Sequence, residues 1–173
     1  MGQKFVHGNL LTKARSIERM DEQTHQYCPD CGASLSSQEI EGQLRAYCAT
    51  CGAPIYRNSK PCAGVLVMDD AQLLLVKRTQ PPSVGSWSVP AGFLEYDGPP
   101  ALGAVRELEE ETGVTASEED IELFDTAFVT AGERANVLVI IYRVERSATK
   151  GEPGSDAGDA RFWEMEAFES ENE

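Results

Sequence analysis

The sequence lacks a long hydrophobic run, and this absence excludes a protein anchored in a membrane by helices. No apolar stretch approaches the roughly 20 residues that a transmembrane helix needs. The first eleven residues also lack the apolar stretch of a secretory signal. The sequence therefore predicts a cytoplasmic protein without membrane contact. Its 173 residues suit one full domain with a small appendage.

Basic residues are also scarce, which limits the classes of partner. The chain has 15 lysines and arginines against 29 aspartates and glutamates, for a net charge of −14. Such a chain is repelled on average by nucleic acid and by anionic membranes. Nucleic acid is therefore disfavoured as a partner. Most of the acidic residues are expected to lie on a solvated surface.

Composition divides the chain into three predicted segments: an N-terminal helical segment (1–25), a cysteine-containing ribbon (26–56) and a main domain (57–173). The first segment carries an apolar stripe with helical spacing, formed by Leu10, Leu11, Ala14, Ile17 and Met20. We expect this helix to pack on the main domain. Binding to a partner is the alternative, and a homodimer is one option because a second subunit could cover the same surface.

The main domain alternates between strand patterns and one helix pattern. Apolar runs at 63–68 and 72–77 flank Asp69 and Asp70 and predict a hairpin. The other predicted elements are a loop over 79–88, a helix over 99–112, strands over 121–130 and 136–144, a loop over 147–160 and a short closing segment over 161–168.

Four of the five cysteines form two copies of a Cys-x-x-Cys-Gly pattern, at Cys28 and Cys31 and at Cys48 and Cys51. The pairs are separated by a spacing typical of a four-cysteine zinc site, and four sulfurs leave no open position, so the zinc would be structural. Two disulfides are disfavoured in a reducing compartment, and a redox pair would not need two copies. Cys62, the fifth cysteine, is expected to be a small buried apolar residue.

The helix over 99–112 concentrates carboxylates on one face. At about 100° per residue, Glu107, Glu110 and Glu111 share an arc of about 100°, whereas Glu109 points away. The opposite side carries Ala101, Leu102, Ala104, Val105 and Leu108. Three like charges on one face repel each other, so the pattern favours a hard cation such as Mg²⁺ or Mn²⁺ bound over them. A solvated acidic helix is the alternative reading.

Gly92 followed by Arg106-Glu-Leu-Glu-Glu-Glu-Thr-Gly-Val114 resembles the box of the Nudix hydrolase family. The four-cysteine ribbon resembles the one that precedes this domain in NADH pyrophosphatases. The resemblance implies an α/β/α sandwich around a mixed sheet and metal-dependent hydrolysis of a pyrophosphate bond. The substrate would be a nucleoside diphosphate linked to another group, of the ADP-ribose, dinucleotide or nucleoside triphosphate type. Glu107, Glu110, Glu111 and the Ala91 carbonyl would bind Mg²⁺ or Mn²⁺, and Arg106 would orient the glutamates.

The chain departs from this pattern at one position, because Gly98 stands where the box has its first glutamate, with Asp97 one place earlier. A weak or silent domain that binds nucleotides and acts as an adaptor through its ribbon is therefore the alternative function. Sequence markers of a particular substrate are missing. Candidate substrate contacts are Lys77, Arg78, Trp87, Phe128, Glu133, Arg134 and Tyr142, and Glu133 is also a weak candidate for the general base.

Overall fold

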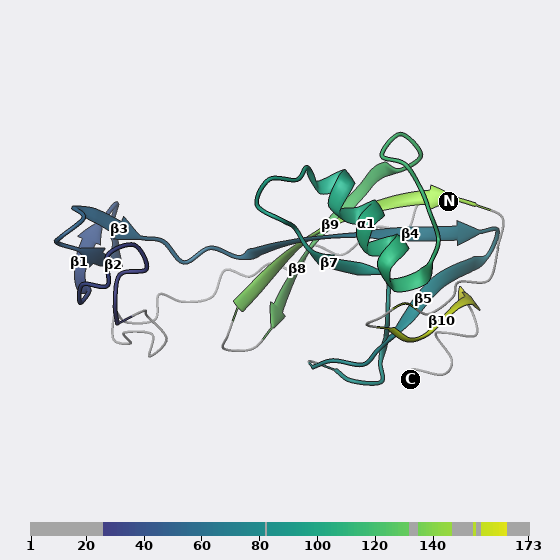
Figure 1. Cartoon of the computed structure of the whole chain (residues 1–173), viewed down its shortest axis with the longest axis horizontal. Coiled ribbons are helices and arrows are strands. Elements are labelled where there is room, and N and C mark those ends of the chain that lie inside the picture. Colours follow the sequence, from purple (N-terminus) through teal and green to yellow (C-terminus); the bar gives the residue numbers. More distant parts are fainter. Residues whose placement is uncertain (1–25, 82, 132–134, 147–153, 155–156, 166–173) are drawn as a thin grey trace. The chain divides into compact units, whose positions relative to one another are not determined.

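The protein is described by a computed structural model (Figure 1), which covers residues 26–81, 83–131, 135–146, 154 and 157–165. The chain divides into two compact units, Met1–Tyr56 and Arg57–Glu173. The helix predicted within residues 1–25 lies outside the described residues. The same holds for Glu133 and Arg134, two of the candidate substrate contacts.

The first unit contains a small antiparallel sheet. Its strands are β1 (Ser36–Ile40), β2 (Gln43–Cys48) and β3 (Ala53–Ile55), in the order β1-β2-β3. The β1–β2 turn has positive φ angles at both Glu41 and Gly42, 52° and 74°, as tight hairpin turns require. In residues 26–56 few apolar side chains are buried, so this small sheet needs another source of stability.

The second unit is built on a mixed sheet. Its elements are β4 (Lys60–Asp69), β5 (Gln72–Arg78), β6 (Trp87–Ser88), β7 (Ala91–Phe93), α1 (Pro100–Thr112), β8 (Glu122–Ala131), β9 (Ala135–Glu145) and β10 (Ala157–Glu164). The strand order is β10-β5-β4-β9-β8, with β6 paired to β5 and β7 paired to β4. β4 and β9 run parallel, and the other pairs are antiparallel.

Helix α1 packs on one face of this sheet and forms the core with it. Alternate residues of β4 point toward the helix, where Val65 and Val67 meet Ala104, Val105 and Leu108. Leu74 of β5 is fully buried in the same cluster. The predicted fold, an α/β/α sandwich around a mixed sheet with a small cysteine ribbon before it in the chain, is confirmed in its mixed sheet, its helix and its cysteine cluster. Within the described ranges α1 is the single α-helix, and it covers one sheet face.

Most predicted elements of the main domain are present. The hairpin of β4 and β5, the helix and the antiparallel pair β8–β9 are confirmed. The prediction of a loop over 157–160 is wrong, because β10 starts at Ala157, opposite Arg78 of β5. Within the loop predicted over 79–88, β6 pairs with the end of β5. In both places the neighbouring strand supplies the pairing, which the local sequence pattern does not encode.

One residue on the apolar side of α1 is exposed. Helical periodicity places Leu102 on this side, but the residue is 47% exposed. It lies about 120° around the helix from the fully buried Leu108, at the border of the packed face. The described residues form no helix with the length and hydropathy needed to cross a membrane.

Candidate active site and metal centre

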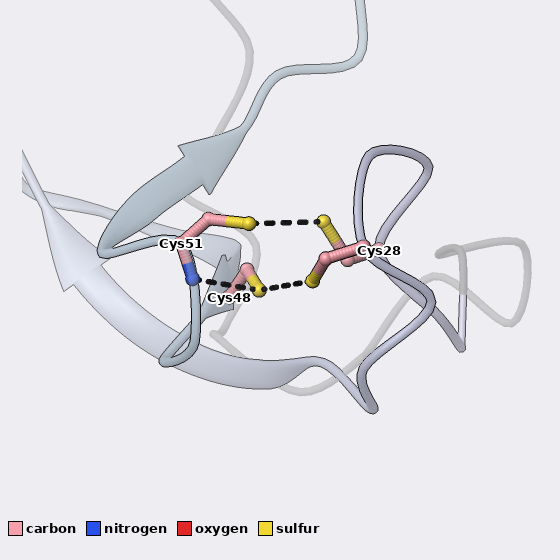
Figure 2. Close-up of side chains that lie close together, drawn as sticks. Cys28, Cys48 and Cys51 are labelled. Carbon is pink, nitrogen blue, oxygen red and sulfur yellow. Dashed lines mark hydrogen bonds between the residues drawn. The ribbon is translucent and has the colours of Figure 1, made fainter.

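The four predicted cysteines come together in the first unit (Figure 2). The Sγ atoms of Cys28 and Cys51 lie 3.9 Å apart, and those of Cys31 and Cys48 lie 3.5 Å apart. Four sulfurs at about 2.3 Å from one zinc ion would lie about 3.8 Å from each other, which fits these distances. A disulfide needs about 2.05 Å, so the thiols are arranged for a metal and not for disulfides.

Each Cys-x-x-Cys segment forms a tight turn closed by its glycine. The Gly32 and Gly52 N–H groups donate to the carbonyls of Cys28 and Cys48 at 2.9 and 2.8 Å. Both glycines have positive φ angles, 72° and 69°, which explains the glycine at this place in the pattern. The Cys51 N–H also donates to the Cys48 sulfur at 3.4 Å and lowers the pKa of Cys48 to about 7. This favours the thiolate at Cys48, whereas contacts with neighbouring thiols raise the pKa of Cys51.

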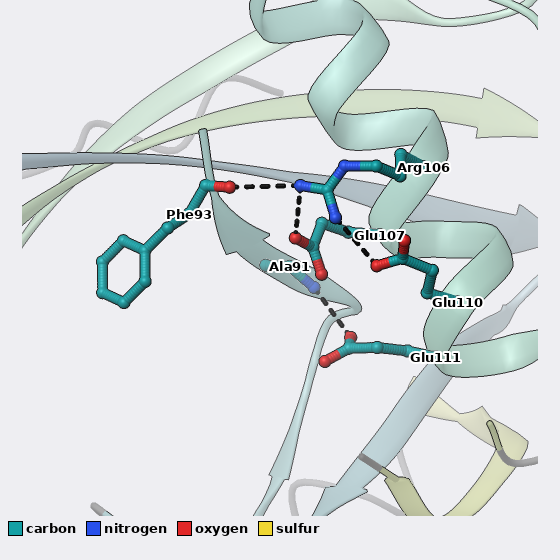
Figure 3. Close-up of polar contacts among 6 residues, drawn as sticks. All are labelled: Ala91, Phe93, Arg106, Glu107, Glu110 and Glu111. Carbon is teal, nitrogen blue, oxygen red and sulfur yellow. Dashed lines mark hydrogen bonds and ion pairs between the residues drawn. The ribbon is translucent and has the colours of Figure 1, made fainter. Parts of the chain in front are cut away.

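The carboxylates of α1 face strand β7 in the second unit (Figure 3). The helix begins after Pro99, whose fixed φ suits a helix start, and ends at Gly113 in the left-handed conformation. These limits place Glu107, Glu110 and Glu111 in the last two turns. Glu109, which the helical periodicity places away from these three carboxylates, is exposed.

Strand β7 contacts the carboxylates through its backbone. The Ala91 N–H donates to Glu111 Oε2 at 3.0 Å. A Cβ atom on Gly92 would fall 2.0 Å from the Glu107 Cδ, so a side chain at residue 92 would occupy the place of this carboxylate. The Glu107 side chain is only 14% exposed. Glu107 and Glu111 are therefore held against the backbone of β7 by packing and hydrogen bonding.

Arg106 joins the cluster to the end of β7. Its guanidinium pairs with Glu107 at 2.7 Å and with Glu110 at 2.8 Å, and it donates to the Phe93 carbonyl at 3.2 Å. The two carboxylates raise the pKa of Arg106 against the opposing effect of burial, so the arginine stays charged. A planar guanidinium can hold two carboxylates in fixed positions, which suits an orienting role.

The carboxylate set fits a hard divalent cation by its chemistry. Three carboxylates from one helix, beside the main chain of β7, supply the oxygen ligands that Mg²⁺ and Mn²⁺ prefer. Among the described residues, however, only the four thiols form a set whose ligand atoms all lie within 4.8 Å of one another. The three carboxylates do not meet this criterion in the structure. Glu110, 54% exposed, pairs with Arg106. It would have to turn from this arginine to join a shared ion.

Position 98 differs from the box without leaving Arg106 unpaired. Gly98 has no atom within 4 Å of the place where a Cβ would lie, so the site is open there. The neighbouring Asp97 is exposed. Among the described residues the ion-pair partners of Arg106 are Glu107 and Glu110, and no ion pair joins it to Asp97.

Cys62 and Arg78 lie close to the same cluster. Burial raises the pKa of the Cys62 thiol to about 11, and the charges of Glu107 and Glu111 act in the same direction. The charge of Arg78 acts against them. Cys62 is 9% exposed, so the prediction of a buried small residue is confirmed. Arg78, a candidate phosphate contact, is therefore close enough to Cys62 for its positive charge to act beside Glu107 and Glu111.

The aromatic residues predicted as substrate contacts lie in different surroundings in the structure. Trp87 of β6 packs against Trp163 of β10, with ring centroids 5.2 Å apart. Phe128 of β8 is 63% exposed, whereas Tyr142 packs against the core. Arg161, whose Cζ lies over both indole rings, is not among the site residues that the sequence predicts. Its spacing of two residues from Trp163 places both side chains on one face of a strand.

Comparison with known proteins gives one family match and several partial relatives. Residues 58–172 match the model of the NUDIX domain. A MutT-like protein of Streptomyces ambofaciens is 31% identical over 90 residues, which are 52% of this chain and 53% of that protein. An ADP-ribose pyrophosphatase of Methanocaldococcus jannaschii is 27% identical over 100 residues, which are 58% and 59% of the two chains. The chain therefore spans little more than half of these curated relatives.

A solved structure supports the fold. The crystal structure of a NUDIX hydrolase from Nitrosomonas europaea superposes with a TM-score of 0.65 at 24% sequence identity. The similarity covers 82% of this chain and 79% of the other. At this level of identity the likeness concerns the arrangement of helix and strands.

Proposed function

Because the chain belongs to the NUDIX domain family, we propose that it hydrolyses a pyrophosphate bond in a nucleoside diphosphate linked to another group. The observation that carries this proposal is the set of carboxylates of α1 placed against strand β7. Glu107 and Glu111 are held by β7, and Glu110 lies beside them on the same helix face. Like charges gathered in this way are consistent with a site for a divalent cation.

The proposed ligands of Mg²⁺ or Mn²⁺ are Glu107, Glu110, Glu111 and the Ala91 carbonyl. A bound divalent ion would neutralise the diphosphate and lower the pKa of a water molecule. Arg106 would keep Glu107 in place through its two other contacts, with Glu110 and with the Phe93 carbonyl. Arg78 would contribute positive charge for a phosphate near the cluster. Such a site acts by positioning and electrostatics, as phosphoryl transfer requires.

The proposed substrate class includes ADP-ribose. One partial relative bears the name ADP-ribose pyrophosphatase, and the site offers carboxylates for metals and cations for phosphates. We infer that zinc bound by the four cysteines stabilises the first unit, since its small sheet buries little apolar area. A cytoplasmic location and a homodimer stay predictions from the sequence.

A nucleotide-binding adaptor with a silent site is the second candidate function. Gly98 in place of the first box glutamate favours it, because one carboxylate that would support the site is missing. Arg106 nevertheless has two carboxylate partners without it, which favours the enzyme. Turnover separates the two candidates directly.

The test is release of nucleoside monophosphate or phosphate from ADP-ribose, NADH, dinucleoside polyphosphates and nucleoside triphosphates with Mg²⁺ or Mn²⁺. Glu110→Gln should lose activity by at least about 100-fold, because one carboxylate ligand becomes a neutral amide. Glu109→Gln removes the same charge from the exposed side of the helix and serves as the matched control. Absence of turnover in the folded, zinc-loaded protein would contradict the enzyme and support the adaptor.

A further inference from the structure

Gly154 lies against the last turn of α1, beside two of the proposed metal ligands. Its N–H group donates to the Glu111 carbonyl at 2.9 Å. Glu111 is one of the last four residues of α1, whose carbonyls have no partner within the helix. The Gly113 N–H satisfies another of these carbonyls, that of Glu109, at 2.8 Å. Gly154 therefore caps the helix end from a distant part of the chain.

The approach of Gly154 to the helix is close enough to require a glycine. A Cβ atom at residue 154 would overlap the Glu110 carbonyl oxygen and lie 2.8 Å from its carbon. It would also lie 3.3 Å from the Glu111 carbonyl carbon. These are main-chain atoms of a helix, which cannot turn aside as the end of a flexible side chain can. A side chain at residue 154 would therefore lift this residue from the helix or shift the last helical turn.

The same glycine is bonded to the start of β10. The Ala157 N–H donates to the Gly154 carbonyl at 3.2 Å. Ala157 is the first residue of β10 and pairs with Arg78 of β5. Gly154 thus links the helix that carries the carboxylates to the strand that begins beside Arg78, the candidate phosphate contact.

The last turn of α1 carries two of the three carboxylates. Glu107 lies about one turn earlier and packs against β7. Glu110 and Glu111 lie in the turn whose main chain contacts Gly154. A shift of this turn would move both carboxylates relative to Ala91, whose N–H donates to Glu111 Oε2 at 3.0 Å (Figure 3).

We propose that Gly154 is a positioning residue of the divalent-metal site, which fixes the last turn of α1 so that Glu110 and Glu111 can bind the cation. This inference rests on the proposed function, because it names a residue that supports the same site. Gly154 acts through the main chain, by its close approach and one hydrogen bond, and does not itself bind the metal. Loss of groups that orient metal ligands typically lowers metal affinity about 10- to 100-fold.

Binding of Mn²⁺ to the full-length, zinc-loaded protein tests the inference without a substrate. Electron paramagnetic resonance measures free Mn²⁺ during the titration, and Glu111→Gln identifies the binding that belongs to the carboxylates. We expect Gly154→Ala to raise the Mn²⁺ dissociation constant about tenfold. The Mg²⁺ concentration needed for half-maximal hydrolysis should rise in the same variant.

Gly158→Ala is the matched control, because it adds the same methyl group to a nearby glycine of β10. Gly158 is exposed, and its added Cβ would meet the Thr79 Cγ2 at 3.1 Å, a side-chain methyl group that can move. This variant should bind Mn²⁺ as the wild type does.

If Gly154→Ala does not fold, Ala157→Pro tests the same link. It removes the N–H that donates to the Gly154 carbonyl and leaves residue 154 unchanged. Proline is tolerated at the first residue of a strand, so the variant should fold. It should also raise the Mn²⁺ dissociation constant.

Wild-type Mn²⁺ affinity in a folded Gly154→Ala protein would overturn the inference, and a lower melting temperature in that variant would show that Gly154 only packs against the helix. The hydrolase would stand in that case, because turnover by the wild type is measured separately. Weakened Mn²⁺ binding in Gly154→Ala, together with no turnover of any substrate by the wild type, would support the positioning role and refute the hydrolase. Equal Mn²⁺ binding by the wild type and Glu111→Gln would overturn both.

Discussion

Gly92 lies directly against the carboxylate of Glu107. A Cβ atom at residue 92 would fall 2.0 Å from Glu107 Cδ and 2.1 Å from its Oε1. The φ angle of Gly92 is not in the left-handed region, so space and not backbone conformation requires the glycine. The carboxylate of Glu107 therefore packs directly against the main chain of β7, in the space that a side chain at residue 92 would need.

Gly92→Ala should therefore displace Glu107 while leaving the fold intact. A displacement of about 1 Å at a catalytic group can cost about 100-fold in rate, and we expect a loss of this order in kcat/KM. The measurement is steady-state hydrolysis, with circular dichroism to verify the fold. Gly98→Ala is the matched control, since no atom lies within 4 Å of its added Cβ. Equal activities of the two variants would contradict the close approach of β7 and Glu107.

A glutamate at position 98 should strengthen metal binding. Arg106 forms an ion pair with Glu110. A carboxylate at the open position 98 would compete with Glu110 for the guanidinium group of Arg106. Glu110 would then be freer to bind a cation. We expect Gly98→Glu to lower the Mg²⁺ concentration at half-maximal activity, with Gly98→Gln as the uncharged control. An unchanged or higher Mg²⁺ requirement would show that Arg106 does not compete with the metal for Glu110.

Removal of one thiol should abolish zinc binding and unfold the first unit. Cys48→Ser takes away a fully buried sulfur that lies 3.5 Å from Cys31. Folding of such small sheets depends on the bound metal. We expect about one zinc per wild-type chain and much less in the variant, measured by elemental analysis. Limited proteolysis should cut residues 26–56 while the second unit resists. Full zinc content in Cys48→Ser would contradict the four-thiolate site.

The thiol of Cys62 should react slowly in the folded protein. Its pKa is raised to about 11 from about 9, so the thiolate fraction at pH 8 falls about 100-fold. Alkylation by iodoacetamide, followed by peptide mass spectrometry, should be slower by at least this factor in the native protein than in urea. Since the raised pKa favours the neutral thiol, its contribution to stability is complete below pH 9 and declines as the pH rises toward 11. Rapid native labelling of Cys62 at pH 8 would contradict this.

Local signals in the sequence predicted the helix and the cysteine cluster. Pro100 and Gly113 mark the ends of α1, and helical periodicity is enough to place Glu107, Glu110 and Glu111 on one side. The spacing of the two Cys-x-x-Cys-Gly turns likewise predicts that four sulfurs meet. These features depend on contacts between residues close in the chain or on a repeated motif.

Features that depend on distant partners were not predictable in the same way. The strand character of residues 157–160 comes from pairing with β5, about 80 residues earlier. The backbone contacts between β7 and the carboxylates, and the position of Arg161 over two indoles, exist only once β6, β7 and β10 have joined the sheet. Leu102 is exposed because the packed face of α1 is narrower than its apolar pattern.

The parallel pairing of β4 with β9 has a consequence for how fast the protein folds. It joins Lys60 to Val137, which are 137 − 60 = 77 positions apart, and runs from there to the pairing of Met68 with Glu145. Contacts between such distant residues close long loops and slow the search for the native state. The hairpin of β4 and β5 and helix α1 can form from nearby residues. We therefore expect the docking of β9 to set the refolding time, with the carboxylate site completed only in a slow final phase.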